Sequence, residues 1–227
     1  FKPIWTVAPY FMMNSRTVNK WIDINIEMIK YAKMRGTNEI AAQIVIEKDV
    51  LEDKNQLEWI ANQYIECDIK NFLVWVDDFS AFESSKLLLE NFCFFVKKLN
   101  TYGARVYNLY GDYFSVLLCH KESPSQLSGV CHGIEYGEKR SVVPVGGGIP
   151  INKYYFYPLH QRIEYGSVAT ILRLHGIIPD NYEKYYEEIC NCPLCQEVIG
   201  KDMDNFQKFG DSKPVEISRG FGKITRN

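Results

Sequence analysis

The sequence lacks the features that mark membrane, secreted and strongly charged proteins. No apolar run approaches the about 20 residues that a transmembrane helix needs, and no charged-then-apolar signal segment opens the chain. The formal net charge is only −2, so no overall basic field draws the protein to nucleic acid. Seven cysteines, an odd number, argue against a disulfide framework. We therefore expect a cytoplasmic protein that does not enter a membrane.

Motifs of common nucleotide-binding and hydrolytic enzymes are also missing. No G-x-G-x-x-G follows the first apolar run, and no Walker loop, H-E-x-x-H or Ser-His-Asp signature occurs. Candidate chemistry must therefore be sought among carboxylates, glycines and thiols.

The composition is that of a globular protein, with 46% hydrophobic and 24% charged residues. A chain of 227 residues suits one large domain, or a domain with a small appendage. Aromatic residues reach 14%, which favours a large core over a site that stacks planar ligands. The chain opens at Phe1 directly in a predicted strand, and we interpret it as a segment of a longer protein.

Apolar runs of strand length alternate with segments of helical periodicity about every 30 residues, which is typical of parallel βαβ units. The predicted strands are 1–11, 39–47, 71–78, 104–111, 129–137 and 142–150, and the predicted helices are 17–36, 49–67 and 80–103. A (β/α) barrel of the TIM type and an open doubly wound sheet both fit this alternation. The missing nucleotide motifs favour the barrel, complete or incomplete.

The alternation ends near Tyr154. We place a (β/α) barrel domain at residues 1–178. Residues 179–227 are predicted to form a small zinc-binding segment followed by a polar, basic tail.

Three thiols crowd into the C-x-C-x2-C sequence formed by Cys190, Cys192 and Cys195. A tight turn with Pro193 would bring them to one point, as a zinc ion requires. An iron–sulfur cluster and unliganded thiols are the alternatives. A closed structural site needs a fourth ligand, for which His175 is our choice. Further candidates are His160, Cys131 and Cys67.

Acidic residues lie at the ends of several predicted strands, beginning with Glu47 at the end of the strand 39–47. Asp77 and Asp78 end the strand 71–78, and Asp112 follows the strand 104–111. Active groups of barrels and doubly wound sheets lie at the carboxyl ends of strands, so the three aspartates are the predicted catalytic acids. Only one of Asp77 and Asp78 can point into a barrel mouth, because successive strand residues face opposite ways. A helix cap or turn is the alternative for each.

Two glycine-containing segments supply candidate substrate-binding groups. His132 and Glu135 lie close enough in sequence to share a proton, although a core histidine beside solvated acids also fits. Gly146, Gly147 and Gly148 directly follow an apolar run. Their backbone N–H groups can face a phosphate or a base edge, or the glycines can serve close packing.

Together, "CNCPLC", "VWVDDF", "GIEYG" and "PVGGG" resemble the tRNA-guanine transglycosylases and their DNA-modifying deazaguanine relatives. The resemblance implies a (β/α)8 barrel, a zinc site, and Asp77 or Asp78 as the acid that reads the base. It also implies that the GI-x-x-G segment and the glycine strand end contact the base, with Tyr136 at the position of the family's glutamine.

The chain departs from the family pattern at two further points. It has no histidine near position 220, where the family's zinc ligand would fall. Between Gly148 and Cys190 the only aspartate is Asp180, so the family's nucleophile has no clear counterpart.

We therefore expect a transferase, namely a glycosyltransferase of the pentosyltransferase, base-exchange type. It would act on a guanine or deazaguanine base in tRNA or DNA and carry zinc, as a homo-oligomer or with a partner subunit. One alternative is a barrel enzyme for a small nucleoside or sugar that uses Asp112, His132 and Glu135. The other is a non-catalytic subunit that binds nucleic acid or protein.

Overall fold

The computed structural model describes residues 4–36, 38–131, 140–143 and 153–206. The chain divides into two compact units, Phe1–Val145 and Gly146–Asn227, which we treat separately. This division falls before the 178/179 boundary expected from the sequence.

A five-stranded sheet forms the centre of the first unit. Its strands are β1 (Trp5–Val7), β2 (Glu39–Ile46), β3 (Asn71–Val76), β4 (Arg105–Leu109) and β5 (Gly129–Cys131). They lie side by side in chain order, and every neighbouring pair is parallel. The predicted parallel α/β sheet is thereby confirmed.

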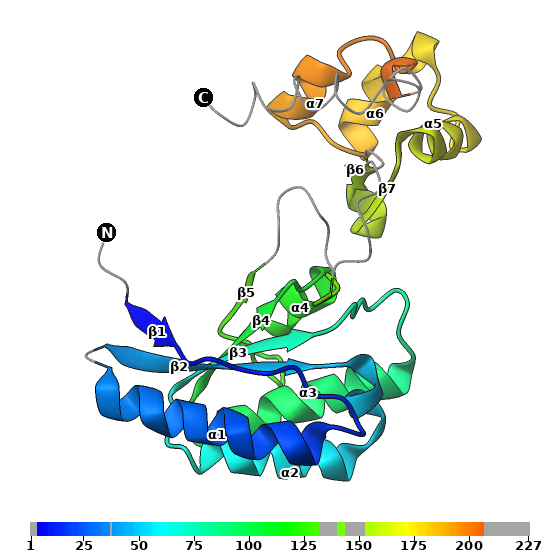
Figure 1. The fold of residues 1–227 in the computed structure, drawn as a ribbon. Helices are drawn as coiled ribbons and strands as arrows, with labels where there is room; N and C mark the ends of the chain where they lie inside the picture. Colours follow the sequence, from blue (N-terminus) through cyan, green and yellow to red (C-terminus); the bar gives the residue numbers. More distant parts are fainter. Residues whose placement is uncertain (1–3, 37, 132–139, 144–152, 207–227) are drawn as a thin grey trace. The chain divides into compact units, whose positions relative to one another are not determined.

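The helices of this unit follow the strands one by one. They are α1 (Val18–Arg35), the 3-10 turn η1 (Lys48–Glu52), α2 (Lys54–Ile65), α3 (Lys86–Asn100) and α4 (Tyr113–Leu118). Figure 1 shows α1, α2 and α3 together on one side of the sheet. A doubly wound sheet has helices on both faces and a reversal of strand order, and the described strands show no such reversal. The five strands of this sheet do not by themselves form a complete barrel.

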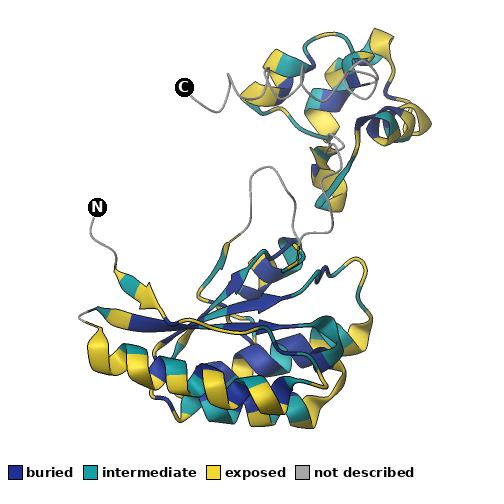
Figure 2. Cartoon of the chain, in the orientation of Figure 1, coloured by how far each residue is buried: buried dark blue, intermediate teal, exposed yellow. Residues whose placement is uncertain are grey.

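The main core lies between the sheet and these helices. Ile44 of β2 and Val74 of β3 are fully buried there. They belong to the same cluster as Ile22 of α1, Ile60 of α2 and Phe95 of α3, which are also fully buried. In Figure 2 the buried residues follow the strands and the helix faces turned toward them. Alternate residues of each strand thus serve this core, and the residues between them face the other way.

Side-chain caps fix where two of the helices begin. Asp53 accepts hydrogen bonds from the backbone N–H groups of Asn55 and Gln56 at the start of α2. The side chain of Ser85 accepts from the N–H of Leu88 and so caps α3. The helix therefore begins at Lys86, six residues later than the start expected at position 80.

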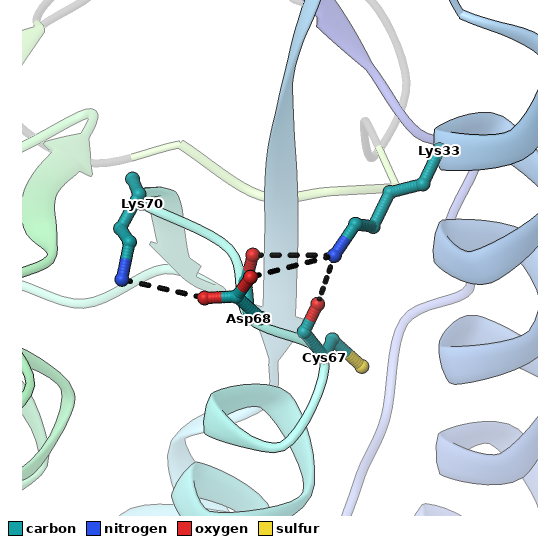
Figure 3. Close-up of polar contacts among 4 residues, drawn as sticks. All are labelled: Lys33, Cys67, Asp68 and Lys70. Carbon is teal, nitrogen blue, oxygen red and sulfur yellow. Dashed lines mark hydrogen bonds and ion pairs between the residues drawn. The ribbon is translucent and has the colours of Figure 1, made fainter.

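Lysine side chains brace the turn that leads from α2 into β3 (Figure 3). The Lys33 ammonium of α1 donates to the carbonyl oxygens of Cys67, at 2.8 Å, and Asp68, at 3.3 Å. The Asp68 carboxylate lies 4.0 Å from Lys33 Nζ and 3.3 Å from Lys70 Nζ. Asp68 adopts φ 50°, in the left-handed region. The carboxylate is largely exposed, so its ion pairs contribute little. The hydrogen bonds from the Lys33 ammonium group to the two backbone carbonyls hold α1 against the turn.

The second unit is built on a short antiparallel hairpin and small helices. Its elements are β6 (Lys153–Phe156), η2 (Tyr157–Leu159), β7 (Gln161–Glu164), α5 (Tyr165–Leu174), η3 (Pro179–Asn181), α6 (Glu183–Glu188) and α7 (Pro193–Val198). Tyr154 of β6 and Tyr165 of α5 contact the ring of Phe206. The residues before position 178 therefore share a core with the thiol segment, which explains why the unit begins earlier than expected.

None of the helices within the described ranges has both the length and the apolar character needed to cross a bilayer.

Candidate functional site

The sheet curves away from its helices. Tyr107 follows Val106, a residue of the helix-side core, and Trp5 pairs with Glu39, the neighbour of the core residue Ile40. Both rings therefore stand on the face opposite the helices. Their centroids are 5.3 Å apart, although β1 and β4 are three strand spacings apart, or roughly 14 Å in a flat sheet. We call this curved side the concave face.

At the carboxyl end of β3, Trp75 and Asp77 alternate with Val74 and Val76 of the helix-side core, so both belong to the concave face. The Trp75 ring lies 4.6 Å from the ring of Tyr110, which directly follows β4. Two aromatic rings and a carboxylate thus meet where parallel sheets bind their ligands.

Arg140 covers this aromatic pair. Its carbonyl oxygen accepts from Trp75 Nε1 at 3.1 Å. Its guanidinium donates to the hydroxyl of Tyr110 at 3.0 Å and lies 5.2 Å from the centre of that ring. The exposed guanidinium therefore places a fixed positive charge beside the rings.

Asp77 is held in position from both sides. Its N–H donates to the carbonyl of Ile46 at 2.8 Å, which extends the pairing of β3 with β2. Its Oδ1 accepts from the N–H of Val142 at 2.5 Å. This hydrogen bond fixes the direction of the carboxylate.

Glu47 occupies the corresponding position on the neighbouring strand. It follows Ile46, which pairs with Val76, so Glu47 and Asp77 are next to each other in the row beyond the paired strands. Asn14 Nδ2 donates to Glu47 Oε1 at 3.2 Å. The sequence places Glu47 at a strand end by the same signal that identifies Asp77, although Glu47 is not among the predicted catalytic residues.

Asp78 turns away from the row that contains Asp77. Its φ of 47° is left-handed, and its carboxylate lies 3.7 Å from Lys48 Nζ. Tyr110, at the end of the next strand, is also left-handed, with φ 58°. Non-glycine residues in this region are strained and cluster at functional sites. The strain here turns the chain sharply at two adjacent strand ends.

The carboxylate of Asp112 accepts hydrogen bonds from backbone N–H groups. Its side chain is buried, with 3% exposed. Oδ2 accepts from the N–H of Ala81 at 2.6 Å, and Oδ1 accepts from the N–H of Ser115 at 3.4 Å. These contacts cap α4 and anchor the loop after β3, so the role of Asp112 in this structure is that of a cap. Its predicted catalytic role stays a prediction.

The predicted substrate-binding residues lie outside the residues that the structure describes. They are His132, Glu135, Tyr136, Gly146, Gly147 and Gly148.

The three predicted thiols do converge. The Sγ atoms of Cys190, Cys192 and Cys195 all lie within 4.8 Å of one another. Cys192 precedes α7, and its sulfur accepts from the N–H of Cys195 at 3.4 Å. Three sulfur ligands at one point match the preference of borderline and soft metal ions. The cluster could therefore hold a metal ion.

The thiols differ in how readily they lose a proton. Burial raises the pKa of the Cys195 thiol to about 12. Burial also acts upward on the pKa of Cys192, but hydrogen bonds from the N–H of Cys195 and from the neighbouring thiols outweigh it and lower that pKa. A buried Cys195 thiolate therefore needs a compensating positive charge. The donor set fits a bound cation.

His175, our predicted fourth ligand, ends α5 as an exposed residue. Among the described residues the metal-ligating group consists of the three cysteines, without His175. Of the other candidates, Cys67 and Cys131 belong to the first unit, and His160 is likewise outside the group of converging ligands among the described residues. The identity of a fourth ligand stays a prediction.

Two phenols also reach the cluster. The hydroxyl oxygens of Tyr154 and Tyr185 lie 3.3 and 3.4 Å from Cys195 Sγ and hydrogen-bond to each other. The sequence offered no signal for this pair, because one phenol comes from β6 and the other from α6.

Comparison with protein-family models, with curated proteins and with solved structures finds no match for this chain, and the resemblance to transglycosylases stays a prediction.

Proposed function

We propose that the protein is a transglycosylase-like enzyme that exchanges a guanine or deazaguanine base in tRNA or DNA. The curved parallel sheet would form part of a TIM-type barrel, and the thiol cluster would hold a structural zinc ion. The observation that carries the proposal is the position of Asp77 beside the Trp75–Tyr110 ring pair on the concave face.

The aromatic pair suits a purine. Planar bases stack on aromatic side chains with about 1–3 kcal/mol per base, and Trp75 and Tyr110 offer two such faces at one strand edge. The guanidinium of Arg140 adds a positive charge next to the rings, where the phosphate or the carbonyl oxygen of a bound nucleotide would be stabilised.

The carboxylates suit the reaction. The resemblance gives Asp77 or Asp78 the role of reading the base, whereas we assign Asp77 the role of the nucleophile: its Oδ2 would attack C1′ of the nucleotide while the bond from C1′ to the base nitrogen breaks. The departing base takes up a proton, the incoming base loses one as it attacks C1′, and the carboxylate is released unchanged. Glu47, next to Asp77 in the same row, is the group we assign to this proton transfer. Asp78 and Asp112 are left with the local roles described above.

Zinc would have a structural role and no role in this chemistry. Three thiolates bind a borderline cation, and Cys195 belongs to the hydrophobic core of the second unit. A metal ion held there stabilises the fold of that unit and takes no part in bond breaking.

The direct test is the incorporation of radiolabelled guanine into tRNA and into duplex DNA by the full chain. Asp77→Asn should lower incorporation by at least about a thousandfold, because it removes the nucleophile and leaves the shape unchanged. Asp68→Asn is the matched control, since Asp68 lies at the opposite, amino-terminal edge of β3, and it should retain activity.

Two outcomes would contradict the proposal. One is label incorporation that is equal in Asp77→Asn and in the unchanged chain. The other is a rise in melting temperature with free nucleosides or sugars and no exchange into either polymer, which would favour a small-molecule enzyme. Salt-sensitive binding of tRNA or DNA without exchange would instead indicate a binding subunit.

A further inference from the structure

Cys195 differs from the other two thiols of the cluster in its surroundings. It is the buried member, with 7% exposed, whereas Cys190 and Cys192 are half-buried. The hydroxyls of Tyr154, at 3.3 Å, and Tyr185, at 3.4 Å, both contact its sulfur. Tyr185 is fully buried in the same core.

When a metal is bound, the number of available hydrogens determines which atoms donate in the contacts among Tyr154, Tyr185 and the Cys195 sulfur. A metal-bound thiolate carries no hydrogen, so the two phenols supply the only two hydrogens for three contacts: Tyr154 to Tyr185, and each of them to sulfur. If one hydrogen lies between the two oxygens, the other must point to sulfur. The Cys195 thiolate therefore accepts at least one O–H hydrogen bond in every arrangement that satisfies the phenol pair.

Such a bond has a physical purpose. Three thiolates around one divalent cation leave an excess negative charge, and burying that charge without hydrogen bonds is costly. An O–H donor to a charged acceptor is stronger than a neutral hydrogen bond. It also lowers the energy of the sulfur lone pair, which makes the thiolate a poorer nucleophile.

We propose that Tyr154 and Tyr185 are positioning residues of the metal centre: the pair donates at least one hydrogen bond to the Cys195 thiolate, and a phenol that does not donate to sulfur itself donates to the phenol that does. They stabilise the metal-bound form and shield the sulfur from electrophiles and oxidants. This inference rests on the metal site of the proposed function, and it is independent of base exchange. It makes the centre a structural and chemically inert one.

The chain supplies a matched control in Tyr186. This residue lies next to Tyr185 on α6, and its hydroxyl donates to the backbone carbonyl oxygens of Gly200 and Cys195. A Tyr186→Phe variant therefore loses a phenol hydroxyl from the same helix without removing a donor to sulfur.

The experiment loads the full chain with Co²⁺ and with Zn²⁺ and compares Tyr154→Phe, Tyr185→Phe and Tyr186→Phe. Loss of a partner of a metal ligand weakens metal binding by roughly 10- to 100-fold, so chelator competition should show this loss for Tyr185→Phe and for Tyr154→Phe. The sulfur-to-cobalt charge-transfer band should move to longer wavelength in both, and alkylation by N-ethylmaleimide should release zinc faster. Tyr186→Phe should leave the band unmoved.

The proposal is overturned if the band and the affinity are unchanged in both variants, or if Tyr186→Phe shifts the band equally. A chain that takes up neither metal overturns it together with the zinc site, whereas base-exchange activity is scored separately.

A measurement on the unmodified protein keeps the proposal testable if the variants fail to fold. In the cadmium-loaded chain, a phenol hydrogen bonded to sulfur should exchange slowly and correlate with the ¹¹³Cd resonance, and the absence of that signal also overturns the proposal.

Discussion

The indole nitrogen of Trp75 donates to the carbonyl oxygen of Arg140 at 3.1 Å, across 65 positions of the chain. The same carbonyl accepts from the N–H of Asp78, and the N–H of Val142 donates to Asp77. Three hydrogen bonds thus fix the segment 140–143 to the end of β3. The arginine and the carboxylate of the candidate site hold each other in place through the backbone.

Trp75→Phe tests this attachment, because it keeps an aromatic ring but removes the N–H donor together with part of the indole. We expect a loss of at least about 1 kcal/mol in the free energy of unfolding, from the hydrogen bond and the lost packing, and faster amide exchange at Val142. Urea unfolding and hydrogen exchange measure the two effects. Trp59→Phe, on the partly exposed face of α2, should leave exchange at Val142 unchanged. Equal exchange in both variants would show that the indole bond does not hold the segment.

Removal of metal should affect the two units differently. The second unit contains Cys195 in its core, so without a cation the thiol must be protonated and the local packing weakens. The sheet unit has a separate core and should keep its protection. Hydrogen exchange before and after chelation measures this, and equal loss of protection in both units would contradict it. Because thiolates are the metal-binding form, chelation should also become easier as pH falls.

Asn71→Leu should stabilise the sheet unit. Asn71 is fully buried in β3, and neither atom of its amide has a hydrogen-bond partner among the described residues. An unsatisfied buried amide costs about 1–3 kcal/mol, so an apolar side chain of similar size should raise the free energy of unfolding. Asn91→Leu is the control, since Asn91 Nδ2 donates to the carbonyl of Leu51 at 2.7 Å, and this variant should be destabilised. A destabilised Asn71→Leu would mean that the amide is satisfied in solution.

Stability should fall at alkaline pH. Burial raises the pKa of Tyr64 well above the ordinary 10.0, and burial also raises the pKa of Cys67 above 9.0. Above these ordinary values the unfolded chain loses protons that the folded chain retains, so the free energy of unfolding decreases as pH rises. It should be constant with respect to these groups below about pH 9 and decline above it. Urea titrations at pH 7.5 and pH 10.5 check the sign, and a higher midpoint at pH 10.5 would refute it.

Much of the sheet was predictable, because strands that are buried on both faces appear in the sequence as continuous apolar runs. Ile44 and Val45 both need an apolar environment, one against the helices and one on the concave face, and both are fully buried. Strands that lie side by side in chain order agree with the predicted barrel type of sheet, whereas a doubly wound sheet would reverse that order. The 153–164 hairpin was missed because its strands have only four residues each, too few to show a period.

Some features of the candidate site were likewise predictable from the sequence, and others were not. The close spacing of Cys190, Cys192 and Cys195 in the sequence predicted that their sulfur atoms lie close together, because few backbone conformations keep such thiols apart. Strand alternation predicted that Asp77 and Asp78 face opposite ways, but only the left-handed φ of Asp78 shows which one leaves the row. The phenol contacts of Cys195 join residues 41 and 10 positions apart, and tertiary packing alone creates them.

The sequential order of β1 to β5 also bears on how the chain is made. Each strand pairs with the one synthesised just before it, so the sheet can grow on the ribosome by successive addition, without waiting for a distant segment. The second unit, with Cys190, Cys192 and Cys195, is translated afterwards. A released chain that ends before Gly146 should therefore already resist protease, although it lacks the metal-dependent part.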